Sequence, residues 1–381
     1  MKNRIQLLVG LSLLISVSVY GLPRFASRMN MPCQSCHVNP SGGGMRNAFG
    51  LTYGRDDISV KAWQKEYALN DFTTQITDFL SYGADFRFLA VYQTIKQTGR
   101  ADESRSTFFP MQADVYLNLA ISKKVNLFVN PAFGPYNRYE VFGIARILPA
   151  KGYVKLGRFT PSYGLRLDDH TSFVRQVTPF RNNSGQQTGL EVGFNPGLFN
   201  LLGALTNGTA GDRDNDLAKA VLGRAEGRLG VGPLNLMAGL STYNDVSGGE
   251  RYNILGAFGT VSLHEGLTVV AEANWIKGNS ASMSINAVRL DRNTAGRSLK
   301  QFTLMVEADC PVIQGVDVKF LYDFFDPNTD AQSGKAERYS AGVEFMPFSG
   351  LEVRPLLRIT KDTTIPNRDY TDVHVMFHLY L

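Results

Sequence analysis

The strongest pattern in this sequence is an alternation of apolar and polar residues in short runs, which continues through most of the chain after residue 83. In one such run, Val316, Val318 and Phe320 occupy alternate positions, and Asp317 and Lys319 lie between them. Successive side chains of a β-strand point to opposite faces. A period of two therefore predicts strands that have one apolar face and one mostly polar face.

The connections between these runs also alternate. Very short ones, such as Pro196-Gly197, Gly232-Pro233 and Gln314-Gly315, take turns with long polar loops, of which residues 160–187 form an early example. Tight turns at one end and long loops at the other are typical of transmembrane β-barrels. From Gly83 onward we count about 16 strands, and we predict an all-β, antiparallel barrel over residues 83–381. A soluble β-sandwich is the alternative, but it does not explain the two kinds of loop.

The last run supports a barrel in the outer membrane of a Gram-negative bacterium. Val373, Val375, Phe377, Leu379 and Leu381 share one face, and the sequence ends there. An apolar, alternating final strand resembles the recognition signal of outer-membrane proteins. We therefore expect the outward face of this strand to contact outer-membrane lipid.

Charged residues recur at the polar positions of the predicted strands. Near the bilayer midplane a lipid-facing Lys or Arg costs about 2–4 kcal/mol, so these side chains must face the lumen. There they either solvate a water-filled pore or pack against a segment that lies inside it. The set comprises Asp85, Arg87, Arg224, Glu226, Arg228, Glu272, Glu307, Asp309, Lys319, Glu344, Arg354 and Arg358.

The N-terminus carries an export signal. Lys2 and Arg4 precede an apolar run from Ile5 to about Tyr20, and Val19-Tyr20-Gly21 lies at the expected cleavage site. This composition predicts a signal peptide over residues 1–21. The apolar run is at the short limit for spanning a bilayer, and an uncleaved membrane anchor is the alternative.

Composition excludes several classes of protein. With 44% hydrophobic residues among 381, the chain is not intrinsically disordered. Its net charge of +5 is spread along the sequence with no cluster of Lys or Arg, so we expect no nucleic-acid partner. Of three cysteines, two lie close together and Cys310 stands alone, which leaves no disulfide framework.

The two close cysteines lie in the run Cys33-Gln34-Ser35-Cys36-His37. Cys-x-x-Cys-His is the attachment signature of a c-type haem. The thiols of Cys33 and Cys36 add to the haem vinyl groups as thioethers, and His37 supplies the proximal axial ligand of the iron. We therefore predict one covalently bound haem c in a small cytochrome segment, residues 22–82, that plugs or caps the barrel lumen.

The ligand on the opposite side of the iron has several candidates: Met29, Met31, Met45, His170, His374 and His378. Met45 follows three glycines that allow the backbone to pass close to a flat cofactor. His170 lies in the long loop 160–187 beside Asp168, Asp169, Arg166 and Arg175, and this loop is a haem contact, an approach site for a metal ion, or an ordinary polar loop. A vacant or water-bound position is a further alternative.

Residues around the haem motif resemble a known family. Pro23, Phe25 and Ala26 precede it, and Phe49-Gly50 and Tyr53-Gly54 follow it. This arrangement resembles the fused monohaem cytochrome–porins of the bacterial outer membrane, whose best-known members oxidise extracellular Fe(II) and pass electrons inward. The resemblance implies that Cys33, Cys36 and His37 hold the haem. The stretch 38–45 departs from the aromatic, Pro-containing stretch of that family, which leaves the substrate and the direction of electron flow open.

These observations together predict single-electron transfer across the outer membrane. The leading hypothesis is oxidation of extracellular Fe(II) with transfer to a periplasmic c-type cytochrome or another soluble carrier. Outward transfer to an extracellular acceptor is one alternative. The others are a diffusion porin with a structural or sensory haem, and a peroxidase-like enzyme.

Overall fold

The computed structural model describes residues 23–61, 63, 73–96, 99, 101–133, 138–181, 185–208, 217–247, 250–263, 266–279, 298–330, 334–364 and 369–381. The predicted signal peptide, residues 1–21, lies outside the described residues. Among the described helices, none is long and apolar enough to cross a membrane.

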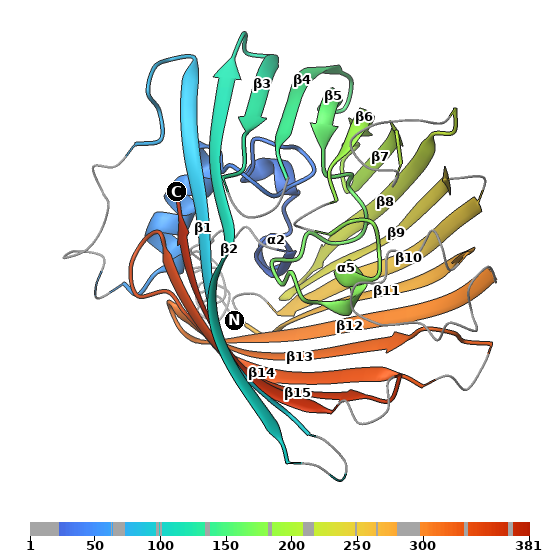
Figure 1. Ribbon diagram of the computed structural model, residues 1–381. Coiled ribbons are helices and arrows are strands. Elements are labelled where there is room, and N and C mark those ends of the chain that lie inside the picture. The colour runs from blue at the N-terminus through green and yellow to red at the C-terminus, as the bar shows by residue number, and fades with distance from the viewer. Residues whose placement is uncertain are drawn as a thin grey trace, which may run out of the picture.

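Sixteen strands in the described part of the chain form one closed barrel (Figure 1). They are β1 Leu80–Ile95, β2 Glu103–Ala120, β3 Val125–Asn130, β4 Glu140–Leu148, β5 Gly152–Phe159, β6 Gln187–Phe194, β7 Phe199–Thr206, β8 Ala220–Val231, β9 Leu234–Ser247, β10 Glu250–Leu263, β11 Thr268–Asn279, β12 Ser298–Ile313, β13 Val316–Asp326, β14 Ala336–Phe345, β15 Leu351–Asp362 and β16 Tyr370–Tyr380.

Every strand pairs antiparallel with its neighbours in the sequence, and the barrel closes where β1 pairs with β16. That pairing runs from Asp85 opposite Tyr380 to Ile95 opposite Tyr370. Closure leaves no unpaired sheet edge, as a sheet in a bilayer requires. The prediction of an antiparallel barrel of about 16 strands is confirmed.

The polar faces of the strands point into the barrel. In β13, Asp317 and Lys319 are buried, whereas Phe320 on the opposite face is 55% exposed. In β16, Phe377 and Leu379 are likewise exposed. An apolar exterior around a charged interior suits a barrel surrounded by lipid. The predicted lumen-facing charges lie inside, where all but Arg224 and Arg228 are fully buried.

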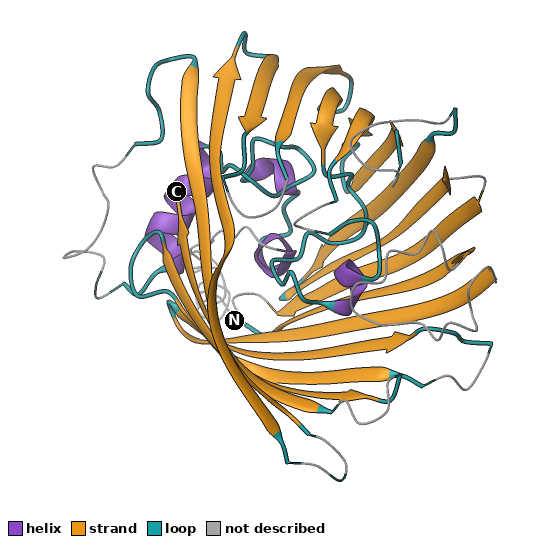
Figure 2. Cartoon of the chain, in the orientation of Figure 1, coloured by secondary structure: helices purple, strands orange, loops and turns teal. Residues whose placement is uncertain are grey.

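One end of the barrel carries the tight turns, several of which need a left-handed residue. Gly232 and Gly315 have φ of +56° and +86°, a conformation that side chains disfavour. At the other end the connections are longer. The connection from β5 to β6, residues 160–186, folds into the barrel and carries α5, Phe173–Gln176 (Figure 2).

Helix α2, Pro23–Arg28, also lies within the ring of strands (Figures 1 and 2). The N-terminal segment continues with the 3₁₀ turn η1, Cys33–Ser35, then α3, Ala48–Tyr53, and the π-helical turn η2, Gly54–Ile58. Helix α2 packs against β9, β10 and β11. The lumen therefore holds two segments that come from distant parts of the sequence.

The outward face of β12 provides a test of the lipid-facing surface. Val306 lies on this face near the middle of the strand, opposite Tyr322 of β13. We expect Val306→Arg to lower the free energy of unfolding by about 2–4 kcal/mol because the charge enters the hydrocarbon layer. Denaturant unfolding in phospholipid vesicles measures this, with Val306→Leu as the control. Equal stability of the two variants would contradict a lipid-facing Val306.

Candidate functional site

The haem motif forms a compact turn. Cys33 begins the 3₁₀ turn, and its carbonyl oxygen accepts hydrogen bonds from the backbone N–H groups of Cys36 and His37 at 3.2 and 3.1 Å. Neither cysteine is in a disulfide, so both thiols are available for thioether formation. Cys36 is buried, and this burial, together with the nearby thiol of Cys33, raises its pKa to about 11. The chain thus presents the two thiols and the imidazole of the motif on one turn.

The segment after the motif folds back as a hairpin. His37 pairs with Arg46, and the backbone N–H of Val38 donates to the carbonyl of Met45 at 3.1 Å. Gly42 lies at the tip with φ +86°, where an added Cβ would be 3.0 Å from the Cβ of Cys33. The glycines therefore allow the hairpin to lie directly against the motif.

A second glycine, in the helix after the hairpin, allows that helix to pack against the motif. A Cβ on Gly50 of α3 would lie 2.2 Å from the carbonyl oxygen of Cys36, so only glycine permits this contact. Asn47 caps α3 by accepting from the N–H of Gly50, and its amide donates to the carbonyl of Ser35. Helix α3 is thereby fixed against the back of the haem motif.

Helix α2 is anchored to the barrel wall by charge. Arg24 is 2% exposed, and its guanidinium donates to Glu344 of β14 at 2.5 Å. It also pairs with Glu307 and Asp309 of β12 at 3.5 and 3.8 Å. Burial alone would lower the pKa of Arg24, but these carboxylates outweigh it and raise the pKa further. Nearby, Arg28 bonds Asp317 and Thr268.

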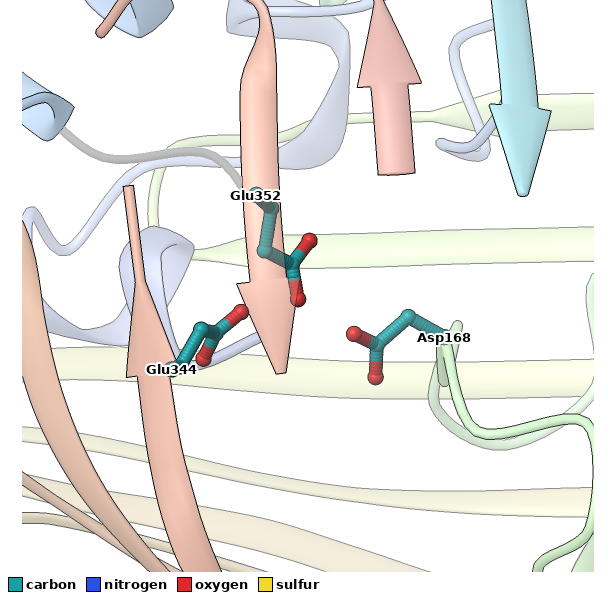
Figure 3. Close-up of side chains that lie close together, drawn as sticks. All are labelled: Asp168, Glu344 and Glu352. Carbon is teal, nitrogen blue, oxygen red and sulfur yellow. The ribbon is translucent and has the colours of Figure 1, made fainter. Parts of the chain in front are cut away.

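Three carboxylates meet beside this anchor, those of Asp168, Glu344 and Glu352 (Figure 3). One oxygen from each lies within 4.8 Å of the others, and Figure 3 shows Asp168 of the inward loop approaching β14 and β15. Cations from several elements balance them, because Arg354 pairs with Asp168 at 2.5 Å and Arg24 with Glu344. The group therefore joins α2, the loop and the wall in one ion-pair network.

The inward loop has further attachments to the wall. Asp169 accepts from Arg358 at 2.9 Å, and Arg175 donates to Glu272 at 2.5 Å. Burial would raise the pKa of Asp169, but the guanidinium groups of Arg358 and Arg338 outweigh it and hold the pKa well below its usual range. These buried pairs fix the loop across the lumen.

Apolar packing fills the space between the same loop and the strands near it. Tyr163 stacks on Phe180 with ring centroids 4.5 Å apart, and Phe180 meets Tyr243 of β9 edge-on at 4.9 Å. Tyr243 in turn contacts Tyr252 of β10 at 6.4 Å. All four belong to one buried apolar cluster. Such a cluster excludes water from this part of the lumen.

Between the N-terminal segment and the loop lies a cavity. Cys33 and His37 line it from one segment, and His170 lines it from the other. Six arginines share the lining, namely Arg46, Arg87, Arg138, Arg166, Arg224 and Arg228. The thiol of Cys33 and the imidazoles of the two histidines are groups that can hold a covalently bound haem.

His170 is the candidate distal ligand that lies on this cavity. Its Nδ1 atom is buried without a hydrogen-bond partner in the described residues, and its Nε2 atom is 3.5 Å from Arg87. Burial, and then the guanidinium groups of Arg87 and Arg138, lower the pKa of this histidine well below its usual value. The ring is consequently neutral at pH 7.

Three of the other candidates have different surroundings. Met45 is 2% exposed and packs with Tyr116 and Phe128 of the wall. His378 lies between Glu352 and Asp85, at 2.8 and 3.0 Å, so that both ring nitrogens face carboxylates. His374 pairs with Asp372 at 2.6 Å and lines a smaller cavity beside the main one.

Sequence reasoning did not identify every residue of the cavity. Met237 of β9 also lines it, and so do Arg46 and Gln112. Met237 lies at an inward position of a strand, where the pattern of alternation gives no reason to separate it from any other lumen residue. Its place on the cavity depends on the shear of the barrel, which the sequence does not reveal.

The sequence matches no protein family model, and no curated protein is significantly similar to it. Solved structures, however, share the fold. The anion-selective porin of Comamonas acidovorans has a TM-score of 0.55 and 14% identity, covering 79% of this chain and 99% of that one. OprB of Pseudomonas putida has a TM-score of 0.57 and 10% identity, and the match covers 80% of this chain and 94% of that one. OmpT of Vibrio cholerae has a TM-score of 0.53 and 11% identity, and the match covers 81% of this chain and 100% of that one.

This chain has the fold of an outer-membrane porin. Identities this low show the fold alone. The matches leave about a fifth of this chain uncovered. A closed barrel of sixteen antiparallel strands with an apolar exterior is the architecture of bacterial outer-membrane proteins. The predicted localisation in the outer membrane of a Gram-negative bacterium is confirmed.

Arg24 provides a test of how the N-terminal segment is held. Arg24→Met removes one of the two cations that pair with the buried carboxylates of Glu307, Asp309 and Glu344, and leaves Lys319 as the other. We expect the free energy of unfolding to fall by about 3–5 kcal/mol. Arg55→Met is the matched control in the same segment, because Arg55 and Asp56 form a solvent-exposed pair, and it should change stability by no more than about 0.5 kcal/mol. Equal effects in denaturant unfolding would refute the anchoring role of Arg24.

Proposed function

We propose that this protein is an outer-membrane haem protein that carries single electrons across the membrane. The observation that carries the proposal is the meeting of Cys33 and His37 with His170 on one cavity inside the barrel. One set comes from the N-terminal segment and the other from a barrel loop. The arrangement suits a cofactor that is bound between the two segments and enclosed by the barrel.

Each residue has a defined role in this proposal. Cys33 and Cys36 would hold the haem through thioethers, and His37 and His170 would ligate its iron. Haem bound in this way supplies one-electron chemistry, with a potential set by its axial ligands and its surroundings. Arg87 holds the loop by donating to the carbonyl of Asp168 at 3.0 Å, which orients the adjacent His170.

The filled lumen supports electron transfer over solute diffusion. The hydrocarbon layer is about 30 Å thick and insulating. Both the N-terminal segment and the loop occupy the interior, and an apolar cluster around Tyr163 and Phe180 closes the space between loop and wall. A water-filled channel needs a polar, open lumen. A redox centre held in mid-barrel shortens the distance that an electron has to cross.

The resemblance to cytochrome–porins suggests the donor and the acceptor. One electron leaves an extracellular Fe²⁺ ion, which becomes Fe³⁺, and reduces one c-type cytochrome in the periplasm. In the alternative, electrons pass outward through the same site, from a periplasmic donor to an extracellular acceptor. The 38–45 hairpin, in which this chain departs from that family, contacts the wall through Arg146, which donates to the carbonyl of Val38.

A diffusion porin with a structural or sensory haem is the second candidate. The fold favours it, since the similar solved structures are porins and one of them is described as anion-selective. The arginines of the cavity would attract anions. Flux of small anions through vesicles that contain the protein, independent of its redox state, would support this function.

Proteoliposomes distinguish the two candidates. With Fe²⁺ outside and a reducible cytochrome c enclosed, we expect the enclosed acceptor to be reduced, while vesicles with Cys36→Ala show no reduction above protein-free vesicles. The experiment is run in both directions. Failure of electron transfer by protein that carries haem, together with rapid anion flux, would replace the proposal by the diffusion function.

His170 provides a spectroscopic test of the distal ligand. We expect His170→Ala to convert the haem from a six-coordinate to a five-coordinate spectrum and to allow CO to bind the ferrous form at least tenfold faster. Met45→Leu and His374→Ala should leave the spectrum unchanged, because neither side chain lines the main cavity. A spectrum that changes with Met45→Leu instead would assign the ligand to Met45.

A further inference from the structure

Arg166 differs from the other charged residues of the loop. It lines the cavity beside the haem motif, with its Cγ 3.6 Å from the position that a Cβ on Gly42 would occupy. Its Nη2 donates to the carbonyl of Thr160 at 2.7 Å, and its Nε is buried without a hydrogen-bond partner. Within the described residues, no carboxylate forms an ion pair with it.

Four neighbouring arginines each have the carboxylate partner that Arg166 lacks among the described residues. Arg87 pairs with Asp85 at 3.3 Å, and Arg138 pairs with Asp114 at 2.8 Å. Arg224 and Arg228 share Glu226. Arg46 likewise forms no ion pair among the described residues, and its guanidinium carbon lies 4.3 Å from the ring centroid of Tyr380.

The cavity as a whole carries the same imbalance. Six arginines line it, and two of them, Arg166 and Arg46, form no ion pair among the described residues. Removing a guanidinium from water without a counter-ion is unfavourable. Burial accordingly lowers the pKa of Arg166, against the opposing carboxylates of Glu140 and Glu191. A ligand with two negative charges would restore the balance.

We propose that Arg166 is the counter-ion of a haem carboxylate, with Arg46 as the counter-ion of the second. This inference rests on the proposed function. A c-type haem uses its two vinyl groups for the thioethers and retains two propionates, which are anionic at neutral pH. Arg166 belongs to the barrel loop and Arg46 to the cytochrome segment, so the cofactor is held by charge from both parts of the chain.

Another source of negative charge is a small anion from solution, such as chloride or phosphate. The chemistry at the guanidinium is the same, and the source is what an experiment has to separate. Haem carboxylates are present only when thioethers are formed. Chloride binds whether or not the chain carries haem.

The first test is the pH dependence of the reduction potential of the purified, haem-containing protein. An arginine beside a propionate keeps it ionised, so the wild-type potential should be flat between pH 6 and 8. In Arg166→Gln the propionate takes up a proton more readily when the iron is ferrous, so the reduction potential should fall as the pH rises. The limit for one electron and one proton is about 59 mV for each tenfold change in proton concentration. Arg166→Lys should restore most of the flat profile.

Arg228→Gln is the matched control, because it removes the same charge from the same cavity but leaves Glu226 paired with Arg224. Its profile should stay flat. A flat profile for Arg166→Gln, or equal slopes for Arg166→Gln and Arg228→Gln, would overturn the assignment. Wild-type protein that carries no covalent haem would instead refute the proposed function, which keeps the two failures distinct.

The second test uses the haem-free variant Cys33→Ser/Cys36→Ser. There Arg166 lacks its partner, so adding Arg166→Gln should raise the melting temperature, whereas the same change lowers it in the haem-containing protein. Both are measured with and without sodium chloride. Stabilisation by chloride that persists in haem-containing wild type and disappears in Arg166→Gln would assign the site to a free anion and overturn the haem contact.

Discussion

The ion pairs between Arg24 and the carboxylates of β12 and β14 join the N-terminal segment to the barrel. A barrel turns its polar strand faces inward, so the lumen is a charged and partly dehydrated space that accepts a folded segment only if the charges match. In the N-terminal segment, Arg24 pairs with Glu344 of the wall. In the inward loop, Asp168 pairs with Arg354 of the wall. With both segments fixed, a cavity of defined shape remains between them.

Much of the fold followed from the period of two. The strand number, the antiparallel order, the outward face of β16 and the inward charges were all predicted correctly, because a bilayer outside and polar groups inside leave few other ways to place such a sequence. The alternation does not predict the inward path of loop 160–187. Its ion pairs with β15 connect residues more than 150 positions apart, and local patterns carry no information about such contacts.

The candidate site was less accessible to sequence reasoning. The motif at Cys33, Cys36 and His37 is local, and five adjacent residues are enough to recognise it. The far side of the cavity depends on barrel shear and on how deep the loop descends. Sequence reasoning favoured Met45 among the distal candidates because of the glycines before it. The structure separates the candidates by their neighbours: packing around Met45, carboxylates around His378, and an open cavity beside His170.

The burial of Cys36 has a consequence for the order of biogenesis. Its thiol is buried in the folded protein, and the carbonyl oxygen of the same residue lies against Gly50 of α3. Under the proposed function, haem attachment to this thiol therefore precedes the folding of the segment and the pairing of β1 with β16.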